Sequence, residues 1–302
     1  MKKFLSLTLL LALLLGSLWG CAAPQPPTDT TPPSATVTAG DGLFHVHYID
    51  VGQADSILLE YEGKYALIDS GYAATGNFLV QYLINAGVEE LEMVVGTHAH
   101  GDHIGGMADI LEHFPVARYW SPVHYYSSPY DKLAYYADQQ DLVTEVPRIG
   151  EAFFLGDVKL QLIGPLGTYY SDLNNTSLVI MAEYKNNRFL FTGDMEQLAE
   201  NELMDAGVDL KADVLKVGHH GSYSSTGYFF LQQVQPSYGI ISCGKDNDYG
   251  HPHSGPLSRL EAFHVETYRT DLMGTVVATS DGTNITFRWD NTQVQPSYSK
   301  RS

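Results

Sequence analysis

Three histidines and one aspartate crowd into six consecutive positions of the segment T97-H-A-H-G-D-H-I-G-G106. These four residues are His98, His100, Asp102 and His103. The apolar run just before them predicts a buried strand. His98 and His100 are two positions apart on the extended chain that leaves this strand, so their side chains point to the same side. Asp102 and His103 lie where a helix begins, and the turn of the chain there lets both face back. Neutral imidazoles and carboxylates suit zinc or manganese, so each pair is predicted to form a half-site for one divalent ion. The alternative is a histidine-rich surface loop.

Asp194 lies in a second segment that follows an apolar strand, F191-T-G-D-M195. Taken alone, the sequence favours a helix cap at this position, because Gln197 follows three residues later as in a capping box. A carboxylate also has two oxygens, so Asp194 is equally placed at a strand end to bridge two metal ions. Both interpretations stay open at this stage.

Two further segments contribute histidines. In V217-G-H-H-G-S222, the adjacent His219 and His220 face opposite ways on an extended chain, so only one is expected to bind metal directly. In the Gly/Pro-bearing loop Y249-G-H-P-H253, His251 is a candidate for the site and His253 is expected to be solvated. The remaining histidines have no partner pattern and are expected to be structural: His45, His47, His113, His124 and His264.

The ends of the chain differ in composition from its middle. Residues 1–20 begin with Lys2 and Lys3, continue as a short apolar run and predict a signal peptide; an uncleaved anchor helix is the alternative. The segment L18-W-G-C21, which ends the predicted signal peptide, resembles a bacterial lipobox. Cys21 is therefore predicted to carry lipid and to anchor the exported protein to the outer face of the membrane. Residues 21–41 are predicted to be a disordered Pro/Thr-rich tether and residues 291–302 a flexible tail.

The body, residues 42–290, alternates strand-like and helix-like segments in both halves. This pattern predicts an α/β (α+β) fold of two sheets with helices outside, an αββα sandwich, rather than one parallel sheet. Cys243 lies in an apolar run and is expected to be buried and inert. The net charge of −18 becomes −20 once the two N-terminal lysines leave with the signal, which argues against a high-affinity DNA-binding module but not against a site that holds one phosphate through metal ions.

Taken together, the histidine segment and T192-G-D194 resemble the metallo-β-lactamase superfamily, which implies the αββα fold and a dinuclear metal site. A closer resemblance is to the hydrolase domain of ComEC-type competence proteins. It rests on motifs that occur in the same order over about residues 43–290: Y48-I-D-V-G-Q-A-D-S-I-L58, L67-I-D-S-G71, N174-N-T-S-L-V179, L215-K-V-G-H-H-G-S222 and Y249-G-H-P252.

The resemblance implies roles for the site residues. His98 and His100 hold one metal, Asp102 and His103 the other, Asp194 bridges them, and His220 completes the second site with His219 as the competing choice. Asp50 and Asp69 are strand-end aspartates, expected to fix loops beneath the site, and His251 is expected to face the substrate phosphate or donate a proton. Many relatives supply a third histidine to the first metal, and here the segment S171-D-L-N-N-T-S177 contains none. Asp172, Asn174 or water is expected in its place, unless His124 or His251 folds back, and oxygen ligands would shift preference from zinc toward manganese.

The function this implies is a metal-dependent phosphodiesterase, specifically a nuclease acting on extracellular DNA through two zinc or manganese ions. The alternative is a phosphocholine-type esterase that acts on cell-wall or lipid head groups. The tether and the acidic charge favour this alternative slightly over DNA. A Tyr-rich stretch at residues 124–136 would stack bases in the first case or surround a quaternary ammonium in the second. A lactonase or β-lactamase comes third, and a surface protein that binds metal structurally comes last.

Overall fold

Strand-forming runs in both halves of the chain assemble into two separate mixed sheets in a computed structural model, which describes residues 40–122 and 130–291. These residues belong to one unit, Thr31–Ser302. Residues 1–39, 123–129 and 292–302 lie outside the description, and with them Cys21, His124 and nearly all of the expected signal peptide, tether and tail.

The first sheet has eight strands in the order β15-β14-β1-β2-β3-β4-β5-β6. They are β1 (Phe44–Tyr48), β2 (Ile57–Tyr61), β3 (Lys64–Ile68), β4 (Met93–Val95), β5 (Tyr119–Trp120), β6 (Thr144–Glu145), β14 (Val276–Ser280) and β15 (Ile285–Trp289). The second has seven in the order β13-β12-β11-β10-β9-β8-β7. They are β7 (Ala152–Leu155), β8 (Val158–Gly164), β9 (Val179–Tyr184), β10 (Asn187–Phe191), β11 (Val214–Lys216), β12 (Tyr238–Ile241) and β13 (Glu266–Arg269).

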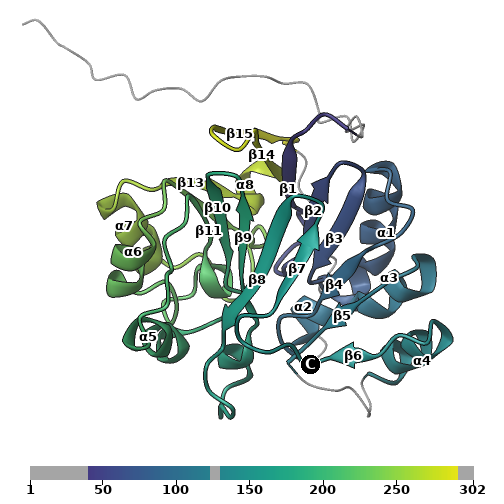
Figure 1. Cartoon of the computed structure of the whole chain (residues 1–302). Coiled ribbons are helices and arrows are strands. Elements are labelled where there is room, and N and C mark those ends of the chain that lie inside the picture. Colours follow the sequence, from purple (N-terminus) through teal and green to yellow (C-terminus); the bar gives the residue numbers. More distant parts are fainter. Residues whose placement is uncertain (1–39, 123–129, 292–302) are drawn as a thin grey trace, which may run out of the picture. The chain divides into compact units, whose positions relative to one another are not determined.

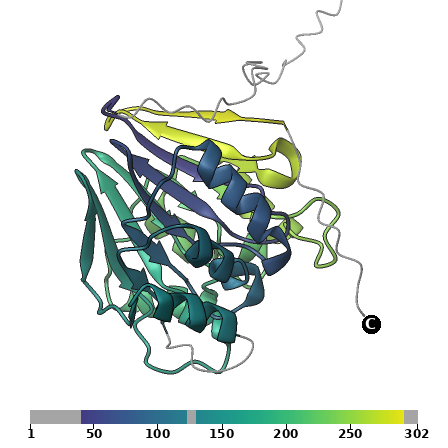
Figure 2. The same ribbon diagram turned by 90° about the vertical axis from the view of Figure 1, so that its right-hand side faces the viewer.

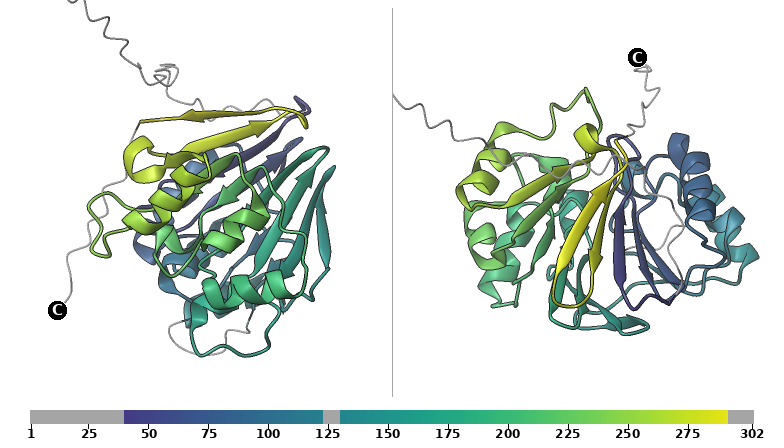
Figure 3. Two further views of the ribbon diagram at one scale, coloured as in Figure 1. Left: turned by 90° about the vertical axis from the view of Figure 1, so that its left-hand side faces the viewer. Right: turned by 90° about the horizontal axis from the view of Figure 1, so that it is seen from above.

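Alternation along the strands divides the apolar residues among three layers of core. On β2, Ile57 and Leu59 face the layer between the two sheets, whereas Leu58 faces the layer under the helices of the first sheet. Helices α1 (Gly76–Asn85), α3 (Met107–His113) and α4 (Asp131–Gln139) cover that sheet (Figure 2). Helices α5 (Gln197–Asp205), α6 (Tyr228–Val234) and α7 (Ser254–Ala262) cover the other (Figure 3). The body is therefore the expected αββα sandwich (Figure 1).

Several elements differ from the sequence-based prediction. The sequence pattern favours one helix over 104–114, whereas the structure has α2 (Gly101–Ile104) and α3 with Gly105 and Gly106 between them. The glycines lie close to the neighbouring backbone, and a Cβ at Gly106 would be 2.4 Å from the Ser70 carbonyl oxygen. The prediction missed short elements without a clear apolar period: β5, β6, β7, β13, α4, α6 and α8 (Thr270–Met273). Cys243 is buried, as expected.

No helix in the described part of the chain combines the length and the apolar character that crossing a membrane requires.

Candidate metal centre

The candidate site lies where strands of both sheets end. β3 and β4 run parallel, and so do β10, β11 and β12, so their carboxyl ends lie at common edges of the two sheets. The segment after β4 carries the histidine cluster, the turn after β10 carries Asp194, and the turn after β11 carries His219 and His220. Parallel pairing thus aligns the segments after β10 and β11, and packing of the two sheets brings them beside the histidine cluster that follows β4.

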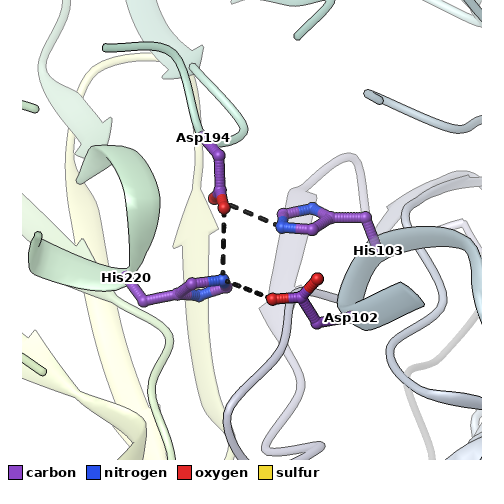
Figure 4. Close-up of side chains that lie close together, drawn as sticks. All are labelled: Asp102, His103, Asp194 and His220. Atoms are coloured by element: carbon purple, nitrogen blue, oxygen red, sulfur yellow. Dashed lines mark ion pairs between the residues drawn. The ribbon is translucent and has the colours of Figure 1, made fainter. Parts of the chain in front are cut away.

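Four side chains form the centre of the site: Asp102, His103, Asp194 and His220 (Figure 4). Each offers one atom, and these atoms all lie within 4.8 Å of one another. Asp194 Oδ1 is 3.2 Å from His103 Nε2, and Asp194 Oδ2 is 3.6 Å from His220 Nε2, which in turn is 3.4 Å from Asp102 Oδ2. The four donors point at one small volume.

A second pair of donors, His98 and His100, lies beside this group, with the His98 ring 4.2 Å from that of His103. His98 Nε2 is 2.9 Å from His100 Nδ1 and 4.0 Å from Asp194 Oδ2. Burial, and then the neighbouring His103, lower the pKa of His98 well below its usual value, which leaves this imidazole neutral and able to donate a lone pair. By these distances, the Asp194 carboxylate lies near both donor groups: His98 with His100, and Asp102 with His103 and His220.

The donor chemistry fits divalent cations. Asp194 Oδ1, His103 Nε2 and His220 Nε2 are buried without hydrogen-bond partners among the described residues, a costly arrangement that a cation relieves. Burial alone would lower the pKa of His220, but Asp194 and Asp55 raise it to about 10, and Asp194 and Asp69 likewise raise that of His103 against burial. Burial would raise the pKa of Asp194, yet His103 and His220 hold it well below its usual range. The field at the cluster therefore favours positive charge.

Carboxylates behind two of the imidazoles orient their rings. Asp69 accepts the Nδ1 proton of His103 at 2.7 Å and is itself held by the Thr97 backbone N–H at 2.7 Å. A hydrogen bond to Nδ1 fixes the tautomer so that Nε2 is the free donor. Behind the other imidazole, His220 Nδ1 donates to the Ser242 carbonyl at 2.9 Å and lies 3.3 Å from Asp55 Oδ1.

Asp55 is paired with a lysine that has no solvent contact. Lys216 Nζ lies 2.8 Å from Asp55 Oδ2, and the side chains of both residues are at most 1 % exposed. Burial alone would raise the pKa of Asp55, but the Lys216 ammonium and then His220 hold it below its usual value. The sequence analysis missed this pair. The available signal was a lysine inside the apolar run of β11, where a charge needs a partner.

Two expectations about the local backbone were wrong. His219 and His220 are not on an extended segment: both have positive φ angles (49° and 53°) within the turn Gly218–Gly221, so their Nε2 atoms lie 3.7 and 3.6 Å from the same Asp194 oxygen. Nor does Asp194 cap α5. That helix begins at Gln197 and its N-cap residue is Glu196. A different side chain, that of Asn175, accepts from the first turn, at the Ala199 backbone N–H with a distance of 3.3 Å.

A pocket of about 320 Å³ opens over the site. It is lined by Gln53, Tyr72, His100, Gly101, Asp102, Asn174, Asp194, His219, His220, Tyr249 and His251. Asn174 is buried there, and its Oδ1 has no hydrogen-bond partner among the described residues. Gln53, Tyr72 and Tyr249 were not singled out from the sequence, since a glutamine or a tyrosine in a loop carries no pattern of its own.

Two further residues from the sequence analysis have structural roles: Asp172 lies outside the pocket, whereas Asp50 fixes its own loop, as expected. Asp172 is exposed, is absent from the pocket lining, and accepts a hydrogen bond from the Asn174 backbone N–H at 3.0 Å, as the cap of a short 3-10 turn. Asp50 accepts from the Gly52 backbone N–H at 3.0 Å and so stabilises its own loop.

Comparison with known proteins places this geometry in a family. The chain belongs to the metallo-beta-lactamase superfamily, whose sequence profile matches residues 49–245. It is 34% identical over 250 residues to ComE operon protein 3 of Bacillus subtilis (strain 168), covering 76% of this chain and 32% of that protein. It is 29% identical over 228 residues to Competence protein ComA of Neisseria gonorrhoeae, covering 74% of this chain and 30% of the relative. The chain thus spans about a third of the length of these curated relatives.

A solved structure shows the same fold. The metallo-beta-lactamase fold protein YhfI from Bacillus subtilis superimposes with a TM-score of 0.54 at 11% identity, over 79% of this chain and 99% of that one. The resemblance to the superfamily and to competence proteins is therefore confirmed, and the chain is a metal-dependent hydrolase of this superfamily.

Proposed function

We propose that this protein is a phosphodiesterase that uses two divalent metal ions, zinc or manganese, to hydrolyse DNA. One observation carries the proposal: the Asp194 carboxylate lies beside a pocket and within 4.0 Å of nitrogens from both proposed ligand groups. Its Oδ2 is 4.0 Å from His98 Nε2 and 3.6 Å from His220 Nε2, and its Oδ1 is 3.2 Å from His103 Nε2. The ligands would be His98 and His100 for one ion, Asp102, His103 and His220 for the other, and Asp194 for both. When bound, such a pair of ions supplies Lewis acidity to the phosphoryl oxygens and lowers the pKa of the attacking water.

His251 is suited to donate a hydrogen bond to the substrate phosphate. Gln53 Oε1 accepts from the Gly244 backbone N–H at 3.0 Å, so its amide Nε2 is the donor that faces His251 Nδ1 at 3.1 Å. Burial and the nearby His220 and His219 lower the pKa of His251 to about 4, which keeps the ring neutral. A neutral ring that accepts at Nδ1 carries its proton on Nε2. His219, whose side chain is 22% exposed, is the second imidazole available to the substrate in this pocket.

DNA is the phosphodiester that the relatives' names support, since one is a competence protein. A second candidate, a phosphocholine-type esterase, is favoured by a specific observation: no lysine or arginine lines the pocket within the described part of the chain. Together with a net charge of −18, this leaves a long polyanion without a basic track.

A hydrolysis panel separates these functions. The purified protein, loaded with manganese or zinc, is given single-stranded DNA, bis-p-nitrophenyl phosphate, p-nitrophenyl phosphocholine and a β-lactam, with Asp194→Ala as the inactive control. We expect turnover of the first two. Preferential cleavage of the phosphocholine ester would establish the second candidate, and cleavage of the β-lactam alone would refute both.

We also propose that Cys21 anchors the protein by lipid to the outer face of the membrane. The native protein is then expected to partition into detergent, and Cys21→Ser to accumulate as an unprocessed precursor. Normal processing of that variant at another position would overturn the anchor.

A further inference from the structure

The loop between β12 and α7 places two rings, those of His251 and Tyr249, in sequence beside His220 of the candidate metal centre. The His251 ring lies 6.3 Å from that of His220 with an interplanar angle of 27°, and the Tyr249 ring lies 5.6 Å from that of His251 at 26°. Tyr249 is 62% exposed, although it lines the pocket. Its ring is therefore a flat, accessible surface beside the candidate ligands.

The loop is held in this shape by side chains of the protein itself. Asn247 Nδ2 donates to the carbonyls of Gly244 and His251 at 2.8 and 2.6 Å, and its Oδ1 accepts from the backbone N–H groups of Tyr249 and His251 at 3.2 and 3.0 Å. Gln53 joins the base of the loop to His251. A ligand that stacks on Tyr249 therefore has little loop ordering to induce, which lowers the entropic cost of binding.

The side chains that line the pocket indicate which chemical groups it can bind. Its lining offers donors for cations and aromatic rings but, among the described residues, no lysine or arginine. Such a site recognises one phosphate through metal and the adjoining group through stacking. A quaternary ammonium is usually enclosed by several rings, whereas Tyr249 and His251 lie nearly parallel, which is the arrangement of a stacking platform for planar rings.

We propose that Tyr249 is a stacking subsite for one unpaired nucleobase next to the scissile phosphodiester, so that the substrate is single-stranded nucleic acid. This rests on the proposed phosphodiesterase function. In a duplex the bases are stacked and paired, and their faces are not accessible to the ring.

Two oligomers with the same phosphodiester backbone test the subsite: a ten-residue oligothymidylate and a ten-residue abasic tetrahydrofuran chain. The thymidine oligomer is expected to be cleaved with a kcat/KM about ten-fold higher, the order of magnitude of one stacked base. Tyr249→Ala is expected to remove this advantage by raising KM for the thymidine oligomer alone. Tyr249→Phe and Tyr249→Trp should retain it, since the ring and not the hydroxyl is needed.

Tyr169→Ala is the matched control, because Tyr169 is 85% exposed and does not line the pocket. Equal cleavage of both oligomers by the wild-type protein, or an equal effect of Tyr249→Ala on both, overturns the subsite while leaving the phosphodiesterase function standing. If neither oligomer is cleaved, the proposed function fails and the subsite with it. A KM increase confined to p-nitrophenyl phosphocholine would assign the ring to a quaternary ammonium instead.

Discussion

At the scale of single residues, the site concentrates backbone strain and buried charge in a few positions. Asp69, His219 and His220 all have positive φ angles, which non-glycine residues rarely adopt. Such conformations persist where the surrounding structure enforces them, and here each places a side chain at the cluster. The buried, partnerless atoms of Asp194, His103 and His220 lie at the same place.

Asp194→Ala is expected to abolish turnover, with a loss of at least about 100-fold, because it removes the oxygen donors shared by both groups. Metal content measured by elemental analysis should fall, while the circular dichroism spectrum remains that of the folded protein. Unchanged activity per folded molecule would contradict the bridging role. Asp205→Ala, at an exposed carboxylate at the end of α5 and outside the pocket, is the control and should retain metal content.

Lys216→Met is expected to lower the free energy of unfolding by about 3–5 kcal/mol, because it leaves the buried Asp55 carboxylate without its cation. Adding Asp55→Asn to this variant removes the uncompensated charge and should recover part of the loss. Urea denaturation in the presence of a chelator measures both effects without a contribution from bound metal. If the double variant is no more stable than Lys216→Met alone, charge pairing is not what Lys216 provides.

At the scale of elements, the geometry of the site depends on how closely α2 and α3 approach the loop after β3. The Ser70 backbone N–H donates to the His103 carbonyl at 2.6 Å, and the Gly106 N–H donates to the Gly71 carbonyl at 3.0 Å. These contacts lock the ligand-bearing turn onto the first sheet. Gly105 and Gly106 therefore separate the two helices and also allow them to pack closely against the loop after β3.

Gly106→Ala is expected to destabilise the protein by about 1–3 kcal/mol, because its Cβ would meet the Ser70 carbonyl oxygen at 2.4 Å and force the junction apart. The shift should also weaken metal binding measured by calorimetry. Gly255→Ala is the matched control: the nearest atom to its Cβ is 3.6 Å away, and alanine is the better helix former within α7. Equal stability of the two variants would show that the junction can move without cost.

At the scale of the whole molecule, residues from both halves of the chain combine into two donor groups of unequal size. Asp102, His103, Asp194 and His220 form a group of four, whereas His98 and His100 have only the shared Asp194 and, in the same pocket, the amide oxygen of Asn174. An amide oxygen donates less charge than an imidazole and prefers harder cations.

Dialysis against a weak chelator is therefore expected to remove the ion at His98 and His100 first and to leave about one ion per chain. Manganese should restore activity better than zinc. Because the ions bind only the folded protein, each addition should raise the melting temperature, the second less than the first. Two equally tight zinc ions with full activity in zinc alone would show that another nitrogen completes the weaker group. Asn174→His, which supplies that nitrogen, should equalise the two affinities.

The sequence alone determined the types of side chain and the strand ends that carry them. Apolar runs that end shortly before His98, Asp194 and His219 are local patterns. Parallel pairing aligns the last two strand ends within the second sheet, whereas the first belongs to the other sheet. The sandwich followed from the same periodicity. Short strands such as β6 and β13 were missed, since two to four residues carry too little pattern to distinguish them from loops.

Tertiary structure decided the contacts between segments. The sequence did not show that His219 and His220 both turn toward Asp194, that Asn175 and not Asp194 accepts from the first turn of α5, or that Asp55 pairs with Lys216. Each depends on a backbone angle or on an approach between distant segments, which close packing fixes only once the whole sandwich has formed. Local sequence patterns thus identified the candidate ligands. Their geometry, their charge partners and the position of the Tyr249 ring beside them depend on the fold.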